Sequence, residues 1–428
     1  MFTPATNTGA IQNTSYKVVI PFYVYAGFSF LAATILLFIS SSNLNHYFQP
    51  NLLATTHAMT LGWGTMIILG ASHQLVPVLI ESKLYSNTLA WLSFALAGIG
   101  IPVLITAFFN FNMGTAAETG GILINAALLC YLLNLFLSIS KSKHENVHAI
   151  FVFTAVIWLL ITTIIGLLLV YNFRYNFFKQ DSLHYLSLHA HIGILGWFLL
   201  LIIGVGTRLI PMFMISKYSN NKLLWAIYFL INAAIISFII LFISADMRFL
   251  YLIPLILSGT GIILFMLYCR NAYKERIRKK IDQPVKISLL SVFMTLIPFL
   301  ILLFVIFASF FIEQNVSFIL LYGFTVFFGW ITAIILGMTF KTLPFIVWNK
   351  VYHTKAGLAK TPNPKDLFSE NIFRWMAIFY LTGFVLFALG LLIKFILLVQ
   401  IASLLLVVTA ILYNSNLLKM VWHKSIIK

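Results

Sequence analysis

Residues 183–213 read LHYLSLHAHIGILGWFLLLIIGVGTRLIPMF, an apolar stretch that is long enough to cross a membrane. Its first third carries three histidines, His184, His189 and His191. An imidazole in hydrocarbon is costly without a partner, and ionisable residues inside a membrane usually line a cavity, a relay or a cofactor site. We therefore expect this helix to face a ligand.

The same pattern occurs three times along the chain. The copies are THAMTLGWGTMIILGASHQLVP (56–77), HAHIGILGWFLLLIIGVGTRLIP (189–211) and YGFTVFFGWITAIILGMTFKTLP (322–344). When their Gly-Trp pairs are aligned, the copies need no gaps and are spaced by 134 and 133 residues. A shared period of this size indicates an internal repeat of a unit of several helices. We place the repeats at about 17–143, 149–280 and 286–417 of a single transmembrane domain, 1–428.

Two positions of the repeat present different side chains in each copy. These positions are occupied by His57, His191 and Phe324, and by Thr55, His189 and Tyr322. The Gly-Trp pair and the later glycines are instead shared by all three copies. We expect the glycines to allow neighbouring helices to approach closely, and the tryptophans to fill the adjoining gaps.

The composition places the whole chain in a membrane, because 61% of its residues are hydrophobic and only 9% are charged. Apolar runs of about 20 residues can cross the hydrocarbon core as helices. Twelve such runs begin near Val18, Leu52, Thr88, Glu118, Ala149, Leu186, Leu223, Phe249, Ile287, Phe318, Phe373 and Phe395. We therefore predict an all-α integral membrane protein with twelve transmembrane helices in three pseudo-symmetric four-helix arcs.

The net charge of +17 does not indicate a nucleic-acid partner, because the basic residues follow the membrane topology. With the N-terminus in the cytoplasm, all but four of the 27 Lys and Arg residues fall on the inner side. The exceptions are Arg174, Lys179, Arg248 and Lys394. We expect both termini in the cytoplasm, anionic lipid at the basic run 270–280, and a local anionic partner for Arg174 and Lys179 at the outer face.

The three histidines of two repeats suggest a haem site. A low-spin haem needs two axial ligands that face each other across the macrocycle, and His57 and His191 occupy the same repeat position at the same depth. His189 is two residues from His191 and so points about 200° away, into a different cavity. His184 lies at the membrane surface, where it is either a partner of a haem propionate or an ordinary loop histidine.

The remaining histidines are expected to have other roles. We expect His73 to be hydrogen bonded near the inner end of its helix, and the others to be solvated: His46, His144, His148, His353 and His423. Glu118 opens a helix at the outer face, where an acidic side chain suits the positive end of the helix dipole.

The two histidine-bearing copies resemble a known family. HAHIGILGWFLLLIIGVGTRLIP is similar to the haem-ligating HxH helix of cbb-type haem–copper oxidase catalytic subunits, and HAMTLGW together with TRLIPMF also resembles the NnrS family of membrane haem proteins linked to nitric oxide tolerance. This resemblance implies a twelve-helix oxidase subunit I-like fold in a bacterial inner (cytoplasmic) membrane. It also implies one or two haem b groups, with His57 and His191 as metal ligands of the low-spin haem and His189 near a second haem.

The chain also departs from the oxidase pattern. The oxidases carry their HxH pair on the tenth helix and histidines for copper on the sixth and seventh, whereas here HxH is on the sixth and the seventh has no histidine. We therefore do not expect a complete copper centre, and we assign no catalytic residue.

The function that these residues favour is a membrane haem b protein for electron transfer or for handling oxygen or nitric oxide. It would take electrons from a donor such as quinol or cytochrome c. Oxidoreductase turnover is left open. Two alternatives also remain open: a polytopic transporter or channel with a histidine-lined path, and a haem-free structural partner of an oxidase.

Overall fold

The computed structural model describes residues 14–80, 82–142, 146–244, 248–311, 315–356 and 360–425. Within these residues twelve helices are long and apolar enough to cross a membrane. This confirms the prediction of an all-α polytopic membrane protein. Several of the twelve are divided by changes of helix type, so the labelled elements are more numerous than the spans.

The elements occur in the following order along the described chain: α1 (Tyr16–Ser40), α2 (Pro50–His57), η1 (Ala58–Thr65), α3 (Met66–Leu79), α4 (Asn87–Phe109), α5 (Thr115–Ile139), α6 (Val147–Tyr175), α7 (Leu186–His191), η2 (Ile192–Leu199), α8 (Leu200–Met214), α9 (Asn221–Ser244), η3 (Arg248–Tyr251), α10 (Leu252–Lys274), α11 (Gln283–Met294), α12 (Leu296–Ala308), α13 (Val316–Phe324), η4 (Thr325–Ile331), α14 (Thr332–Tyr352), η5 (His353–Lys355), η6 (Pro364–Leu367), α15 (Glu370–Ile393) and α16 (Ile396–Val421).

Local sequence explains several of the helix ends. The side chains of Ser86 and Ser369 accept hydrogen bonds from the backbone N–H three residues on, which caps the N-termini of α4 and α15. Asn176 and Lys394 follow α6 and α15 in the left-handed conformation, with φ of 47° and 56°.

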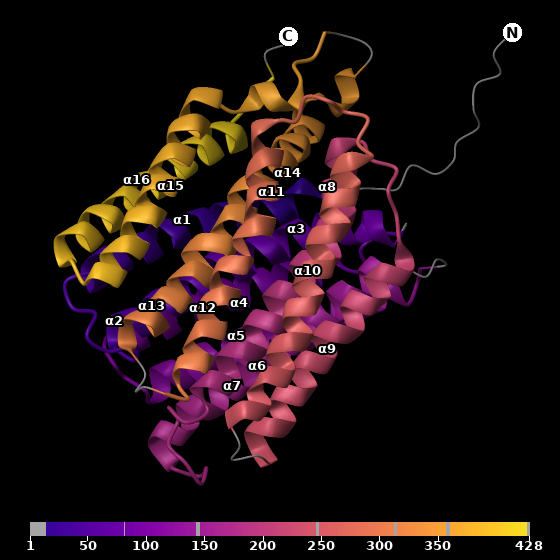
Figure 1. Cartoon of the computed structure of the whole chain (residues 1–428). Coiled ribbons are helices and arrows are strands. Elements are labelled where there is room, and N and C mark those ends of the chain that lie inside the picture. Colours follow the sequence, from indigo (N-terminus) through magenta and orange to yellow (C-terminus); the bar gives the residue numbers. More distant parts are fainter. Residues whose placement is uncertain are drawn as a thin grey trace, which may run out of the picture.

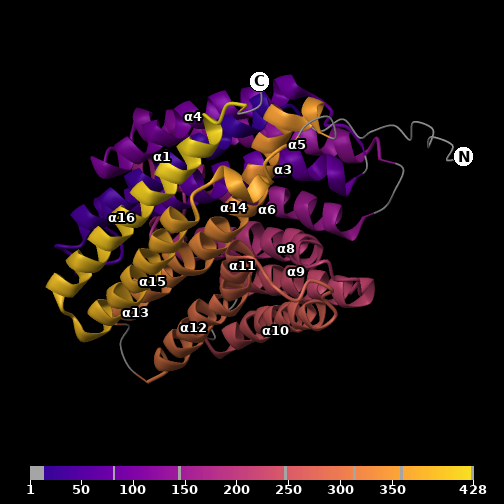
Figure 2. The ribbon, with the colours of Figure 1, turned by 90° about the horizontal axis from the view of Figure 1, so that it is seen from above.

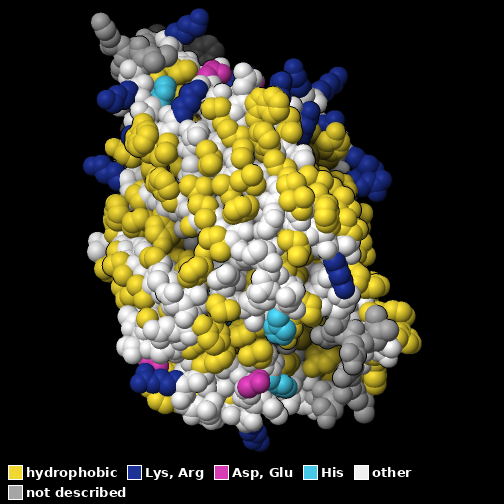
Figure 3. All heavy atoms as spheres, turned by 90° about the vertical axis from the view of Figure 1, so that its left-hand side faces the viewer, with side chains coloured by type: hydrophobic (Ala, Val, Ile, Leu, Met, Phe, Trp, Pro, Cys, Tyr) yellow, Lys and Arg dark blue, Asp and Glu magenta, His cyan; other side chains and the backbone are white. Residues whose placement is uncertain are grey.

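The helices form a closed bundle in which the last helix packs against the first. α1 contacts α16, and Asn414 donates a hydrogen bond from Nδ2 to the backbone oxygen of Gly27 over 2.8 Å. Figure 1 shows the bundle from the side, and Figure 2 shows from above that the N-terminal, middle and C-terminal helices occupy neighbouring sectors. On the face shown in Figure 3, hydrophobic side chains cover the middle and Lys and Arg side chains gather mainly at one end.

Each of the three motif helices contains a π-helical segment at the same place in the repeat. The segments are η1, η2 and η4, and they follow His57, His191 and Phe324 directly. π-helical turns are rare and occur often at functional sites, because the extra residue shifts the direction of the side chains. The repeat inferred from the sequence is therefore also a repeat of local backbone structure.

The repeated glycines lie where two helices approach closely. A Cβ at Gly70 would overlap the side chain of Phe22 on α1, and a Cβ at Gly204 would overlap that of Phe151 on α6. These contacts confirm that the glycines of the motif permit close packing against the preceding helix.

Hydrogen bonds between the three motif helices join the repeats at the centre of the bundle. Trp197 donates from Nε1 to Oγ1 of Thr65 over 3.0 Å, and Trp63 donates from Nε1 to Oγ1 of Thr332 over 3.2 Å. In each repeat that supplies the acceptor, the threonine lies two positions after that repeat's own tryptophan. Both bonds therefore join equivalent positions of two repeats. The second repeat contacts the first in the same way as the first contacts the third.

Candidate functional site

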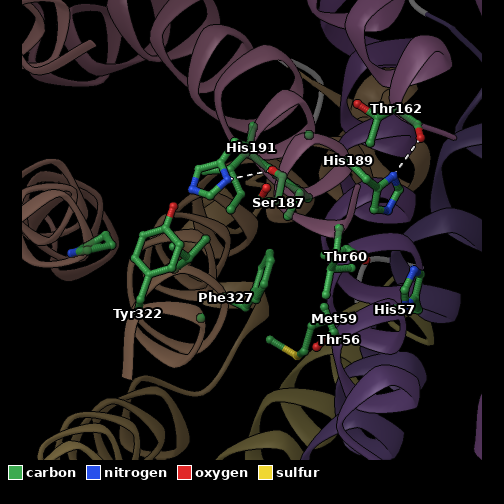
Figure 4. Close-up of a pocket in the computed structure, with 18 of the residues that line it drawn as sticks. Thr56, His57, Met59, Thr60, Thr162, Ser187, His189, His191, Tyr322 and Phe327 are labelled. Atoms are coloured by element: carbon green, nitrogen blue, oxygen red, sulfur yellow. Dashed lines mark hydrogen bonds between the residues drawn. The ribbon is translucent and has the colours of Figure 1, made fainter. Parts of the chain in front are cut away.

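One large cavity lies between the three motif helices. Its volume is about 1020 Å³, and its wall includes His57, His189 and His191. Figure 4 shows His57 and His189 on one side of this cavity and His191 with Tyr322 on the other. The structure thus brings three of the four predicted cofactor residues to one cavity, but in two separate pairs.

The first pair consists of His57, at the end of α2, and His189 on α7. Their ring centroids are 6.3 Å apart and the ring planes differ by only 16°. His57 also has the ring of Phe108 on its flank, at 4.7 Å between centroids. Two nearly parallel imidazoles from different repeats therefore stand opposite each other in an apolar setting.

Hydrogen bonds to backbone carbonyls orient both rings. His57 Nδ1 lies 2.9 Å from the backbone oxygen of Leu53, and His189 Nδ1 lies 2.9 Å from that of Thr162. Because a carbonyl oxygen only accepts, each Nδ1 carries the proton and donates it, which leaves the lone pair of a neutral ring on Nε2. Metal-binding histidines are commonly held in this way, with the second ring nitrogen bonded to a carbonyl.

The space around the first pair is bounded by the helices α4, α5 and α6. We call it compartment one, and the residues that line it beside the two histidines are Leu104 and Phe108 of α4, Gly121, Ile124 and Asn125 of α5, and Thr163, Gly166, Leu167 and Val170 of α6. A Cβ on Gly166 would lie 2.8 Å from Cε1 of His189. The imidazole of His189 therefore fits against α6 because residue 166 has no side chain.

The second pair consists of His191 and Tyr322, whose ring centroids are 5.8 Å apart with planes 16° from parallel. His191 Nδ1 is bonded to the backbone oxygen of Ser187 over 2.8 Å, so its Nε2 also holds the free lone pair. We call the surrounding space compartment two. It is lined by Phe238 of α9 together with residues of α10 and α12, among them Ser258 and Phe299.

The third equivalent position is filled by aromatic side chains. Phe324 takes the place that His57 and His191 hold in the other repeats, and its ring stacks on Phe387 at 4.0 Å between centroids. Phe384 and Phe328 lie within 5.5 Å and 5.4 Å of the same ring. At this position of the repeat, the first two copies thus carry an imidazole that faces the cavity. The third copy carries a phenyl ring that packs among other phenyl rings.

The pairing predicted from the sequence is wrong, because His57 stands opposite His189 and not opposite His191. The bonds from Trp197 to Thr65 and from Trp63 to Thr332 show that two pairs of motif helices contact each other in the same sense. Equivalent residues therefore meet different flanks of the neighbouring motif helix. Residues two positions apart on a helix point about 200° apart. Hence His57 meets His189, and His191 meets Tyr322, which occupies the repeat position of His189.

Other polar residues are placed partly as predicted. Arg174 has the expected anionic partner, since its Nη1 lies 3.3 Å from Oε1 of Glu118. His73 is buried and bonded to the backbone oxygen of Leu69 over 2.6 Å, as expected. His184 is exposed at the surface, where its ring packs against that of Phe242 with 5.3 Å between the centroids and the planes tilted by 51°.

The prediction of a solvated His148 is wrong, and His144 lies outside the described residues. His148 is buried in the first turn of α6, and its Nδ1 lies 2.8 Å from the backbone oxygen of Gly204. His423 was also expected to be solvated, but its Nε2 bonds to the hydroxyl of Tyr352 over 2.8 Å. Basic neighbours in sequence do not exclude a buried side chain when the helix begins inside the bundle.

The first pair fits a bis-histidine iron. A metal–imidazole bond is about 2 Å long, so two such bonds on opposite sides of one iron put the ring centroids about 6 Å apart once the ring radius is added. The separation of 6.3 Å between His57 and His189 agrees with this value. Among the described residues, no three His, Cys, Asp or Glu side chains gather as a metal cluster.

Sequence reasoning missed two residues of the site. Tyr322 was noted only as a replacement for histidine, although its place in the repeat alignment would have paired it with His191. Gly166 lies outside the repeated motif, and nothing in the sequence marks it as the residue against which His189 packs.

The chain matches no known protein-family model, and no match is found among curated proteins.

Proposed function

We propose that the chain is a membrane haem protein in which His57 and His189 hold the iron of a haem b in compartment one. The observation that carries this proposal is the pair of nearly parallel imidazoles 6.3 Å apart, each fixed through Nδ1. The haem would supply one-electron redox chemistry. The protein residues would bind it, orient it and exclude water from it.

The proposed arrangement follows the oxidase-like plan of three four-helix arcs around a central axis. It is supported by the π-helical segments η1, η2 and η4, which recur at one place in each repeat. In this plan the haem lies in the outer half of a bacterial inner membrane, both termini lie in the cytoplasm, and a donor such as quinol or cytochrome c delivers electrons at the outer side.

Compartment two has a different role in this proposal. There His191 is the single imidazole, and Tyr322 stands opposite it. This compartment thus offers one imidazole where compartment one offers two, so a haem held here would have a single histidine ligand from the chain. We therefore propose that this compartment receives oxygen or nitric oxide, at a second haem held by His191, and that electrons pass between the two compartments.

The purified protein tests the haem proposal directly. Membranes from cells supplied with a haem precursor are solubilised, and the protein is then titrated with haem to saturation. A reduced-minus-oxidised spectrum with a low-spin α band, and at least one haem b per chain by extraction, is the expected result. A protein that stays colourless through the titration would contradict the proposal and favour a histidine-lined transport path.

A further inference from the structure

One face of α6 leads from the histidine pair to the rim of compartment one. Thr162, Gly166, Val170 and Arg174 follow one another at intervals of four residues, so each lies beside the next one on the surface of α6. Thr162 accepts from His189, Gly166 contacts the same ring, and Val170 lines the cavity. Arg174 is the next residue in the series and lies about 12 Å beyond Gly166 by helical rise.

The neighbouring helix α5 provides the partner of Arg174 at the same rim. Glu118, Gly121 and Asn125 are spaced by three and four residues and share one face of α5, and the last two line the cavity. Nη1 of Arg174 lies 3.3 Å and 3.5 Å from the two carboxylate oxygens of Glu118. The ion pair therefore spans the two helices that wall compartment one, one turn above its lining.

This ion pair leaves donors of the guanidinium unused. An arginine has five N–H donors, but only Nη1 of Arg174 donates to a side chain or backbone group of the described chain. Its side chain is 48% exposed, whereas that of Glu118 is 11% exposed. The guanidinium can thus bind a second carboxylate while Glu118 stays in place.

We propose that Arg174 is the anion-binding residue of compartment one, pairing with a carboxylate at the edge of the molecule that His57 and His189 hold. This inference rests on the proposed haem site. Haem b carries two propionate carboxylates on one edge, and a carboxylate is costly in hydrocarbon. That edge must therefore lie at the rim, where Arg174 fixes which way the macrocycle enters the compartment.

The test compares two ligands in matched variants. Haem b and its dimethyl ester, which lacks both carboxylate charges, are bound to wild type, Arg174→Gln, Glu118→Gln and Lys179→Gln. Lys179 is an exposed cation on the following loop and forms no ion pair within the described residues, so it controls for loss of one outer positive charge. The rate of haem loss to an excess of a haem-scavenging protein and the midpoint potential are measured.

Wild type and Lys179→Gln should lose the ester about tenfold faster than haem b, because a charge-assisted bond is absent. In Arg174→Gln this difference should vanish, and the midpoint potential should fall because a positive charge near the haem is removed. Glu118→Gln keeps the guanidinium, so it should retain the difference in loss rate between haem b and its ester, and its midpoint potential should rise because a negative charge near the haem is removed. It also shows whether loss of the ion pair alone affects the fold.

Two results would overturn the inference, and a third would overturn the proposed function instead. If Arg174→Gln keeps the full difference between haem b and its ester, Arg174 does not bind the propionates. If Arg174→Gln and Glu118→Gln change haem loss equally, the pair acts only by joining α5 and α6. If wild type binds neither ligand with a low-spin spectrum, the haem site itself is wrong.

Discussion

The imidazole of His189 lies directly against Gly166, so closely that a Cβ at this glycine would be 2.8 Å from Cε1 of the ring. The contact packs the ring of His189 against α6. The hydrogen bond from its Nδ1 to the backbone oxygen of Thr162 fixes the rotation of the same ring. A glycine outside the repeated motif therefore sets the position of a residue inside it.

Gly166→Ala should weaken haem binding without unfolding the protein. The added methyl group has to displace the His189 ring, and overpacking of this kind costs about 1–3 kcal/mol, which corresponds to about 5- to 150-fold in affinity. Haem titration measures the loss. The matched control is Gly98→Ala, because Gly98 does not line the cavity and a Cβ there meets only Cε2 of Tyr25, at an ordinary contact distance of 3.7 Å. Equal affinity in the two variants would show that the contact does not position the ligand.

Hydrogen bonds between repeats should contribute measurably to stability. Thr65→Val leaves Nε1 of the buried Trp197 without its acceptor, which costs about 1–3 kcal/mol. Thermal unfolding in detergent should show a lower midpoint temperature. Thr34→Val is the control, since this equally buried hydroxyl bonds only to the backbone oxygen of Leu31 in its own helix. The same decrease in both variants would mean that the bond between repeats is not special.

The third repeat interface lacks this bond for a simple reason. The position two residues beyond the tryptophan is threonine in the first and third repeats, Thr65 and Thr332, but leucine in the second, Leu199. By the cyclic pattern, Trp330 would face Leu199. The described structure thus shows two of three equivalent bonds, and the sequence explains why the third does not form.

The ion pairs at the end of α11 should make stability depend on acid. Burial of the Asp282 carboxyl opposes its ionisation, but the hydrogen bond from Lys341 and the charges of Lys341, Arg278 and Lys365 outweigh this and hold the pKa of Asp282 below its usual 3.8. A lowered pKa favours the folded state at higher pH, and this contribution is lost as the pH falls below 3.8 and through the pKa of the folded protein.

Asp282→Asn should therefore lower stability at neutral pH by about 1 kcal/mol and flatten the loss of stability in acid. Unfolding midpoints between pH 7 and pH 3 measure both effects. Glu275→Gln removes an exposed acid from the same loop and should leave the profile unchanged. An unaltered acid profile in Asp282→Asn would assign the acid sensitivity to other groups.

Much of the architecture could be predicted from the sequence because it depends on composition and spacing. Apolar runs of membrane length predicted the twelve spans, and the aligned glycines predicted close helix contacts such as that of Gly70 with Phe22. The outer cations Arg174 and Lys179 predicted an anionic partner. Arg174 has one in Glu118, whereas Lys179 forms no ion pair within the described residues. Each of these inferences uses a property that a residue carries in any well-packed membrane helix.

The pairing of side chains could not be predicted in the same way, because it depends on which flanks of two neighbouring motif helices meet. Equal positions in an alignment suggested that His57 faces His191, but in the structure the ring of His57 lies opposite that of His189. The burial of His148 depends likewise on where α6 enters the bundle. The spacing of residues in the sequence predicts which side chains share a face of one helix. It does not predict which faces of two helices come into contact.

His57 and His189 are the two proposed ligands of one iron, and electron paramagnetic resonance of the oxidised protein tests this assignment most directly. His189→Ala and His57→Ala are compared with His191→Ala, a matched loss of one cavity-lining imidazole. We predict that the low-spin ferric signal disappears in the first two variants and persists in His191→Ala. A signal that survives in His189→Ala but is lost in His191→Ala would contradict the pairing seen in the structure.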